Sequence, residues 1–475
     1  MNAADEGKRE HLATLGIRLV QARLRAAAVQ HDDDARAIEE VVAALLLDAL
    51  RIGNAAPAAR WFLGTQGVRS QCAMWPEPAV ALTHDDVFAR LRPGSAVVLM
   101  ATTSDARAVL LMLVRDDKGH AALHRHILPA HDSPEAILRA MQAMAPDILD
   151  ITLIPAGPLR CVPWQSHAAS VLPQGMRLRL HLTVAAWWRQ RADRGVHDAA
   201  RPEAPPSWVL AAHDAWHTGN LDDRLQWVQI ESFLSHRLWD GGRIVPLQEG
   251  STTSLAATAL LACGHGTASD FGGGGRRRGA GLATSLPRLP QLRQMLLNCC
   301  EMGRVDDVAG DPRGLLAQAF TRGLRFAMAP LTRVHDFDMS LFSLAYQWCL
   351  RCAFEQSPTR VEVDWVGVFE HLQASLRMGE WPPGFAVWLA DELPTALRHT
   401  IPDVPAARAD EDAELERKDW FHVLRALSEE LAMPDTVPRP SRCWNEFYDS
   451  VSLALSQRAP QRVRATAQGV IAIGE

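Results

Sequence analysis

Two stretches of this chain decide how it is expected to fold: LLACGHG at residues 260–266 and MLLNCCEMG at residues 295–303. Each begins with a short apolar run, which is typical of a buried strand. Each run is followed by one reactive side chain, His265 in the first stretch and Cys300 in the second, with a glycine close behind. If the two strands are neighbours, His265 and Cys300 lie together where the strands end.

A thiol and an imidazole in that arrangement make a nucleophile and its base. A thiol attacks an amide as the thiolate, and an imidazole within reach takes the thiol proton. The imidazolium can later protonate the leaving amine. The backbone N–H groups of Gly266 and Cys300 can stabilise the oxyanion, and a glycine at 266 lets the scissile carbonyl approach the backbone. The two stretches therefore predict a cysteine peptidase with a His265/Cys300 dyad.

Other interpretations of the same residues stay open. A single histidine at a strand end is commonly a satisfied core or surface residue, and a buried cysteine usually packs as a small hydrophobe. Cys263 and His265 share one face of a strand and could join Cys299 or Cys300 in a zinc shell. The spacing differs from the usual zinc motifs, and the two matched strand ends favour the dyad. We therefore expect neither a metal nor a cofactor.

Composition narrows the function classes. The chain has 475 residues, a net charge of −6 and eight scattered cysteines. The negative charge argues against general nucleic-acid binding, and no apolar run approaches the roughly 18 residues that a membrane span needs. A chain of this length needs no disulfide framework, so we expect a cytoplasmic protein. Cys349 and Cys352 form a C-x-x-C in an apolar helix, where packing is the expected role.

Alternating strands and helices predict an α/β fold with a mainly parallel sheet flanked by helices. The helices expected from apolar spacing and capping residues are a hairpin within residues 8–52, then 133–144, 227–238, 251–259, 313–322 and 339–351, with mostly helical structure over 360–458. The expected strands are 95–101, 106–114, 124–128, 148–154, 208–212, 260–264, 295–298, 326–331 and, last, 469–474. We expect the strands ending at Ile154, Gly264, Asn298 and Ala329 to lie side by side.

The chain resembles the CHAT family of cysteine peptidases, which are relatives of caspases and separases in clan CD. Residues 297–303 align with the family's L-S-A-C-E-T-G, which puts the nucleophile on Cys300 and the alanine position on Cys299. Further similar blocks are residues 153–159, 162–164, 314–320 and 327–336. The resemblance implies a caspase-like peptidase domain at 88–350, between a helical N-terminal region at 1–87 and a mostly helical C-terminal extension at 351–475 that includes a possible last core strand.

The resemblance also implies a regulated endopeptidase with a protein substrate, an activating protein partner and a role in bacterial antiviral defence or cell death. The alternative is a catalytically inactive caspase-like scaffold that binds partners. An acid near Cys300 would favour a basic residue before the cleavage site. Asp336 best matches the family's turn, and Glu301 is a second substrate-binding candidate; Asp306, Asp307 and Asp338 are the other acids in reach, and all four aspartates could instead be solvated loop acids.

The segment at 272–281 holds four consecutive glycines and three arginines between the two stretches. It lacks the G-x-x-x-x-G-K-[ST] pattern of a phosphate-binding loop. Ordering glycine-rich backbone costs on the order of 1–2 kcal/mol for each residue. We expect this loop either to order or to be cut on activation, or to be a surface insertion without a role.

Overall fold

The computed structural model of the protein describes residues 63, 82–102, 107–129, 132–173, 175–197, 205–213, 225–239, 244–246, 254–264, 266, 282–308, 311–356, 363–400, 422 and 444–474. The helical hairpin predicted within residues 8–52, most of the N-terminal region at 1–87 and the glycine/arginine loop at 272–281 lie outside these residues. So does His265.

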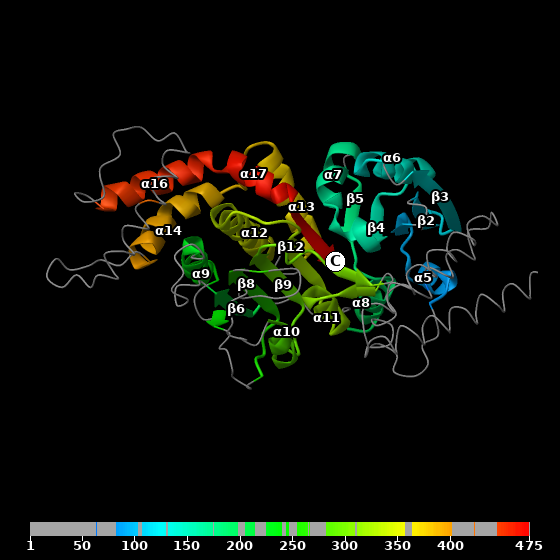
Figure 1. The fold of residues 1–475 in the computed structure, drawn as a ribbon, viewed down its shortest axis with the longest axis horizontal. Helices are drawn as coiled ribbons and strands as arrows, with labels where there is room; N and C mark the ends of the chain where they lie inside the picture. The colour runs from blue at the N-terminus through cyan, green and yellow to red at the C-terminus, as the bar shows by residue number, and fades with distance from the viewer. Residues whose placement is uncertain are drawn as a thin grey trace, which may run out of the picture.

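A sheet of 11 strands forms the centre of the molecule (Figure 1), in the order β3-β2-β1-β4-β5-β13-β12-β9-β8-β6-β7. Its strands are β1 (Ser95–Thr102), β2 (Arg107–Arg115), β3 (Ala121–Pro129), β4 (Asp150–Pro155), β5 (Arg177–Leu180), β6 (Trp208–His213), β7 (Ile244–Pro246), β8 (Ala259–Gly264), β9 (Gln294–Cys299), β12 (Phe326–Pro330) and β13 (Val470–Gly474). Neighbouring strands are parallel except at β1–β2, β2–β3 and β12–β13. The predicted α/β class with a mainly parallel sheet is confirmed.

The strands with parallel neighbours fall into two groups that run in opposite directions. Strands β1, β4, β5 and β13 share one direction, and β12, β9, β8, β6 and β7 share the other, because β13 pairs antiparallel with β12. The prediction that the strand ending near Ile154 lies beside the other three was therefore wrong. Strands β5 and β13 separate β4 from β12, and β4 runs the opposite way, so its carboxyl end faces the other edge of the sheet.

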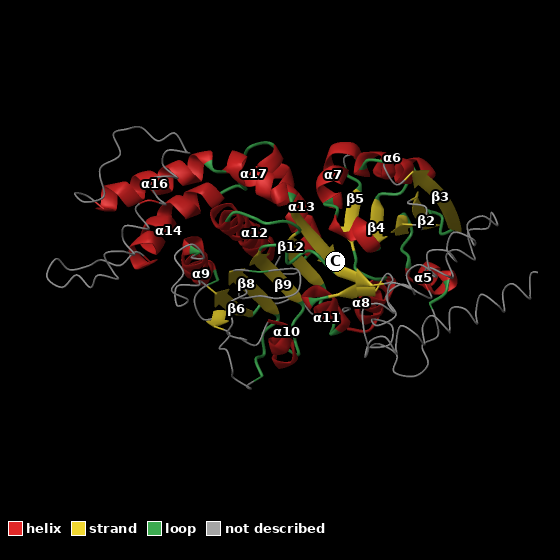
Figure 2. Ribbon diagram, viewed as in Figure 1, coloured by secondary structure: helices red, strands yellow, loops and turns green. Residues whose placement is uncertain are grey.

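Helices cover both faces of the sheet (Figure 2). They are α5 (His84–Arg90), α6 (Pro134–Met144), η1 (Gly157–Cys161), α7 (Trp164–Val171), α8 (Val184–His197), α9 (Gln226–Leu238), α10 (Leu282–Ser285), η4 (Leu286–Arg288), α11 (Leu315–Thr321), α12 (Asp336–Gln356), α13 (Trp365–Arg377), α14 (Phe385–Thr400), α16 (Trp444–Arg458) and α17 (Pro460–Gln468). Among the helices described, none is both long and apolar enough to cross a bilayer.

The helix expected at 251–259 is wrong for the residues described there. Residues 254–258 have no helical turn, and β8 begins at Ala259. The backbone groups of this segment bond to distant parts of the chain: the Leu255 N–H donates to Arg288 O at 2.9 Å and the Thr258 N–H to Ser207 O at 2.9 Å. Backbone donors that are committed in this way are not available for the i−4 bonds of a helix.

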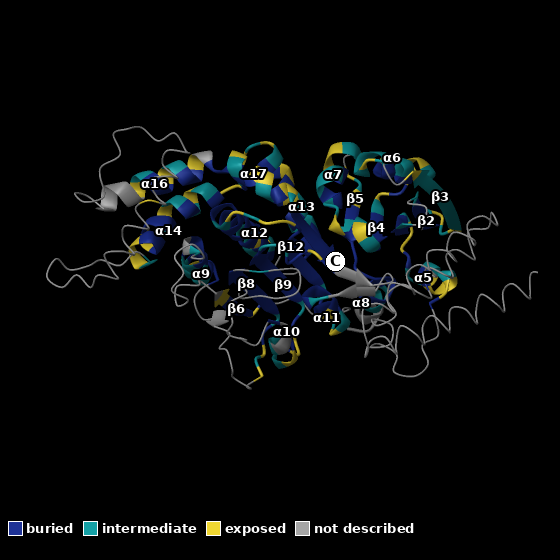
Figure 3. Cartoon of the chain, in the orientation of Figure 1, coloured by how far each residue is buried: buried dark blue, intermediate teal, exposed yellow. Residues whose placement is uncertain are grey.

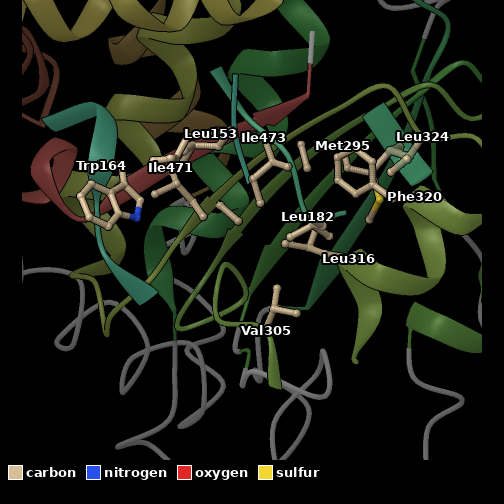
Figure 4. Close-up of a cluster of buried hydrophobic side chains, with 14 of the residues drawn as sticks. Leu153, Trp164, Leu182, Met295, Val305, Leu316, Phe320, Leu324, Ile471 and Ile473 are labelled. Carbon is tan, nitrogen blue, oxygen red and sulfur yellow. The ribbon is translucent and has the colours of Figure 1, made fainter. Parts of the chain in front are cut away.

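Two hydrophobic clusters separate the faces of the second half of the sheet. Along β8, Leu261 and Cys263 pack with side chains of α9, α12 and α13, while Leu260 and Ala262 pack with side chains of α10 and α11. This alternation is the two-residue period of a strand. Because both faces are covered, strands β8, β9 and β12 are buried throughout (Figure 3), which explains their continuous apolar runs. Figure 4 shows the second of these clusters, with Met295 and Phe320 among its members.

The last strand, β13, lies in the middle of the sheet rather than at its margin, and the C-terminus lies near the centre of the view in Figure 1. Its pairing with β5 is confined to Ile473 and Leu180. The side-chain amide of Gln165 completes the bonding, donating to Ala472 O at 2.7 Å and accepting from the Ala472 N–H at 3.1 Å. The C-terminal region at 351–475 thus contributes a central strand, and α12 runs through residue 350 without a break.

Candidate active site

The two stretches that carry His265 and Cys300 form neighbouring parallel strands, as predicted. Strand β8 pairs with β9 from Ala259 and Gln294 to Gly264 and Cys299, the last residue of each strand. The residues that follow are His265 on one strand and Cys300 on the other. The two strands therefore end at the same level of the sheet, and His265 and Cys300 each directly follow one residue of the last pair.

Beyond the strands the two chains stay in contact at Gly266. A Cβ atom added to Gly266 would lie 2.6 Å from Cys299 Cβ, 2.8 Å from Met302 Cγ and 3.1 Å from the Cys300 carbonyl oxygen. Only a glycine fits this approach. His265 itself lies outside the described residues, but its two neighbours in the chain are both held against the Cys299–Met302 segment. The pairing of His265 with Cys300 stays a prediction.

The two adjacent cysteines have different environments. Cys299 is 1% exposed, its Sγ donates to Ala262 O at 3.3 Å, and burial, aided by the charge of Glu231, raises the pKa of its thiol well above the usual value. Cys300 is half-buried, and its Sγ donates to the carbonyl oxygen of Val334 at 3.6 Å. A thiol that is buried and held neutral is inert. Cys300 is therefore the candidate nucleophile of the pair.

The turn after Cys300 is fixed to the end of β12. Glu301 has a φ of 57°, a left-handed conformation that is uncommon for a residue with a side chain. Its N–H donates to Thr332 O at 3.1 Å, and the Gly303 N–H donates to Pro330 O at 2.7 Å. A Cβ at Gly303 would lie 2.8 Å from that same Pro330 oxygen. Strained backbone of this kind persists where surrounding contacts hold it, and it is common at active sites.

The predicted acids differ in what they contact. Asp336 begins α12, two residues after Val334, and its Oδ2 accepts the Trp227 N–H at 3.2 Å, which caps α9. Burial raises the pKa of Asp336 to about 7. Asp338 is instead paired with Arg462, at 2.6 Å from Oδ1 to Nε. The Glu301 carboxylate is 3.5 Å from an Arg304 nitrogen.

Of these acids, only Asp336 has a buried side-chain oxygen, Oδ1, without a hydrogen-bond partner among the described residues. Asp306 and Asp307 lie on β10 (Asp306–Val308), which pairs with β11 (Asp311–Arg313), and their side chains fall outside the described part. Asp336 thus remains the candidate closest in sequence and structure to the segment that contacts the Cys300 thiol.

Glu231, which was not among the acids expected from the sequence, is buried near the ends of β8 and β9. Glu231 is the only acidic residue within α9 and has no exposed surface. Its Oε2 accepts hydrogen bonds from Asn298 Nδ2 and, at 3.1 Å, from Ser340 Oγ. Burial raises the pKa of Glu231 to about 7. A single acidic residue one position after Ile230 and three before Leu234, at the spacing of the helix's buried face, is the signal that could have found it.

The remaining cysteines considered as ligands are placed in the core. Cys263 and Cys299 belong to different hydrophobic clusters on opposite faces of the sheet, so they do not converge on one ion. In the part of the chain that is described, no three His, Cys, Asp or Glu side chains come together as a metal site. Cys349 packs in the core beside α12's other apolar residues, as predicted, and burial raises the pKa of its thiol to about 12.

The arrangement at the ends of β8 and β9 is thus an accessible thiol on a constrained turn, a glycine pressed against it, and a histidine between two residues that are held beside it. A scan against protein-family models matched none for this chain, and a search of curated proteins found no match either.

Proposed function

We propose that this protein is a cysteine endopeptidase in which Cys300 is the nucleophile and His265 is its base. One observation carries the proposal: Gly264 pairs with Cys299, and Gly266 then touches Cys299 and Met302. The one residue between these two glycines in the sequence is His265, which supports its pairing with Cys300. A thiol and an imidazole at adjacent strand ends support nucleophilic attack on an amide.

The reaction follows from these groups. His265 takes the proton of Cys300, and the thiolate forms a bond to the carbonyl carbon of the substrate. The C–N bond then breaks, and the amine leaves with the proton from the imidazolium. Water adds to the thioester, releases the acid and restores the thiol. The backbone N–H groups of Gly266 and Cys300 are the proposed donors to the oxyanion.

We also propose that this chain has the caspase-like fold of the CHAT family, which its sequence resembles. Support comes from the parallel arrangement of β12, β9, β8 and β6, which brings the ends of these strands to one edge. It also comes from the position of Cys299, which is buried and inert where the family has alanine. We further propose a protein substrate, with Asp336 as the group that selects a basic residue before the cleavage site.

Latency is part of the proposal. The thiol of Cys300 donates to Val334 O at 3.6 Å, a weak contact that competes with His265 for the thiol and so lowers its basal reactivity without abolishing it. An activating protein partner would release this contact. We also propose that the glycine/arginine loop at 272–281 regulates the enzyme. Deletion of residues 272–278 tests this role, and unchanged basal and stimulated cleavage would show that the loop has no regulatory role.

The decisive experiment is a peptide-library cleavage assay on the full chain and three variants. We expect Cys300→Ala and His265→Ala to abolish cleavage and Cys299→Ala to retain most of it, because the dyad acts as a unit and Cys299 is outside it. Loss in Cys299→Ala with retention in Cys300→Ala would move the nucleophile by one residue. A folded protein whose Cys300 shows no reaction that depends on His265 would instead be the inactive scaffold.

A further inference from the structure

The carboxyl group of Glu231 is the meeting point of four elements under the candidate active site. It projects from α9 and accepts from Asn298 on β9 and from Ser340 on α12, both through Oε2. Cys263 on β8 and Ser343 on α12 lie close enough to affect its pKa, while Oε1 has no hydrogen-bond partner among the described residues. All these side chains are buried. A buried polar group of this kind is costly unless its partners satisfy it, so the network specifies one arrangement of the elements.

The two strand residues in this network have matching positions. Asn298 precedes Cys300 by two residues, and Cys263 precedes His265 by two residues. Since side chains two apart on a strand share a face, the network lies on the face toward which the dyad is expected to project. Glu231 therefore holds β9 at the last inward-facing position before Cys300, and that position pairs with Cys263 of β8.

From this arrangement we infer that Glu231 is a positioning residue, which sets the position of Cys300 relative to His265 by tying β9, the neighbour of β8 in the sheet, to α9 and α12. The inference rests on the proposed function, because it names what holds the dyad in place. It assigns no contact with substrate to Glu231. An error of about 1 Å in such a dyad can cost on the order of 100-fold in rate, so the tie has a measurable consequence.

The chemistry of the group fits this role. Burial raises the pKa of Glu231 to about 7, so the neutral acid, which can donate as well as accept, is populated up to neutral pH. The groups that face it are Asn298, Cys263, Ser340 and Ser343, none of them a cation. Glutamine has the same shape, accepts through its carbonyl oxygen, donates through its amide and does not ionise, so it can keep the tie.

The test is the rate at which iodoacetamide alkylates Cys300 in the full-length protein, followed by mass spectrometry of the Cys300 peptide at pH 7.5. This readout needs neither substrate nor activator. We expect Glu231→Leu to slow alkylation of Cys300 by about tenfold or more, because the thiol loses its base. Glu231→Gln should stay within about threefold of wild type, since a conservative replacement that keeps the hydrogen bonds rescues the geometry.

A matched control separates positioning from core stability. Leu234 lies one turn away on α9 and is also fully buried, so Leu234→Ala destabilises the same helix without touching the network. We expect its folded fraction to alkylate at the wild-type rate. Equal slowing in Leu234→Ala and Glu231→Leu would overturn the inference. If Glu231→Leu does not fold, Asn298→Ala removes the donor on β9 and should show the same slowing.

His265→Ala distinguishes failure of the inference from failure of the proposed function. If Cys300 alkylates equally fast with and without His265, the dyad is wrong and Glu231 has nothing to position. If His265→Ala slows the reaction but Glu231→Leu and Asn298→Ala do not, the peptidase stands and the positioning role fails. Slowing by His265→Ala, Glu231→Leu and Asn298→Ala, with rescue by Glu231→Gln, supports both.

Discussion

The buried carboxyl of Glu231 should make the stability of the folded protein depend on pH in a predictable direction. Its pKa is about 7 in the folded protein, against an ordinary value of 4.5. Below pH 4.5 the group is neutral in both states. As the pH rises above 4.5 the unfolded chain loses this proton while the folded protein keeps it, so the free energy of unfolding falls until about pH 7 and then levels off.

The size of this effect follows from the two pKa values. The difference between 4.5 and about 7, at about 1.4 kcal/mol for each pH unit, amounts to about 3 kcal/mol. Burial also raises the pKa of Asp336 and of Glu370 to about 7, so the whole protein should lose stability over the same range. Comparison with Glu231→Gln isolates one group, because the variant keeps both of the others and lacks only this titration.

The assay is urea unfolding of wild type and Glu231→Gln at pH 4.5, 5.5, 6.5 and 7.5, conditions chosen to bracket both pKa values. We expect wild type to lose about 3 kcal/mol relative to the variant across this range. Replacing the exposed Glu380 by glutamine is the control, and it should leave the wild-type dependence unchanged. A constant difference between wild type and Glu231→Gln, or one that grows in favour of wild type with pH, would refute the reasoning.

Three further predictions test the site and the sheet. Gly303→Ala places a Cβ 2.8 Å from Pro330 O, so it should lower the free energy of unfolding by about 1–3 kcal/mol, measured by thermal unfolding. It should also lower turnover, and normal turnover would show that the turn tolerates displacement. Asp336→Asn should weaken a preference for basic residues in peptide profiling. It should keep the α9 cap, because asparagine still accepts the Trp227 N–H. A wild-type preference for apolar residues would contradict the role of Asp336 in specificity. Deleting residues 470–475 should abolish folding, measured by circular dichroism, since β5 and β12 lose the strand between them; a folded truncated chain would contradict this.

Much of the local structure could be predicted from the sequence. The apolar runs before His265 and Cys300 were interpreted as strands, and they are β8 and β9. Ser133 was expected at a helix start, and its Oγ accepts the Ala136 N–H at the first turn of α6. The final apolar run was expected to be a strand and is β13. These features depend on neighbours in the chain, through side-chain period and capping, which a single sequence displays.

The helix expected at 251–259 shows where such local signals fail. Its residues have helical spacing, yet their backbone groups bond to residues 207 and 288, and no local pattern contains those partners. In the same way, the run ending at Ile154 reads as a buried strand and is one, but its place in the sheet and its direction depend on β5 and β13.

The sequence by itself thus determined the class of fold and the existence of most strands, and it supplied the proposed pairing of His265 with Cys300. Only the tertiary structure decided that β13 enters the middle of the sheet, that Cys299 is fully buried while its neighbour Cys300 is half-buried, and that Glu231 joins α9 to β9 and α12. The physical reason is the range of the interactions. Strand and helix periods repeat within a few residues, whereas burial and hydrogen-bond partners are set by segments that lie 30 to several hundred residues apart, as Asn298 does from Glu231 and Ala472 does from Gln165.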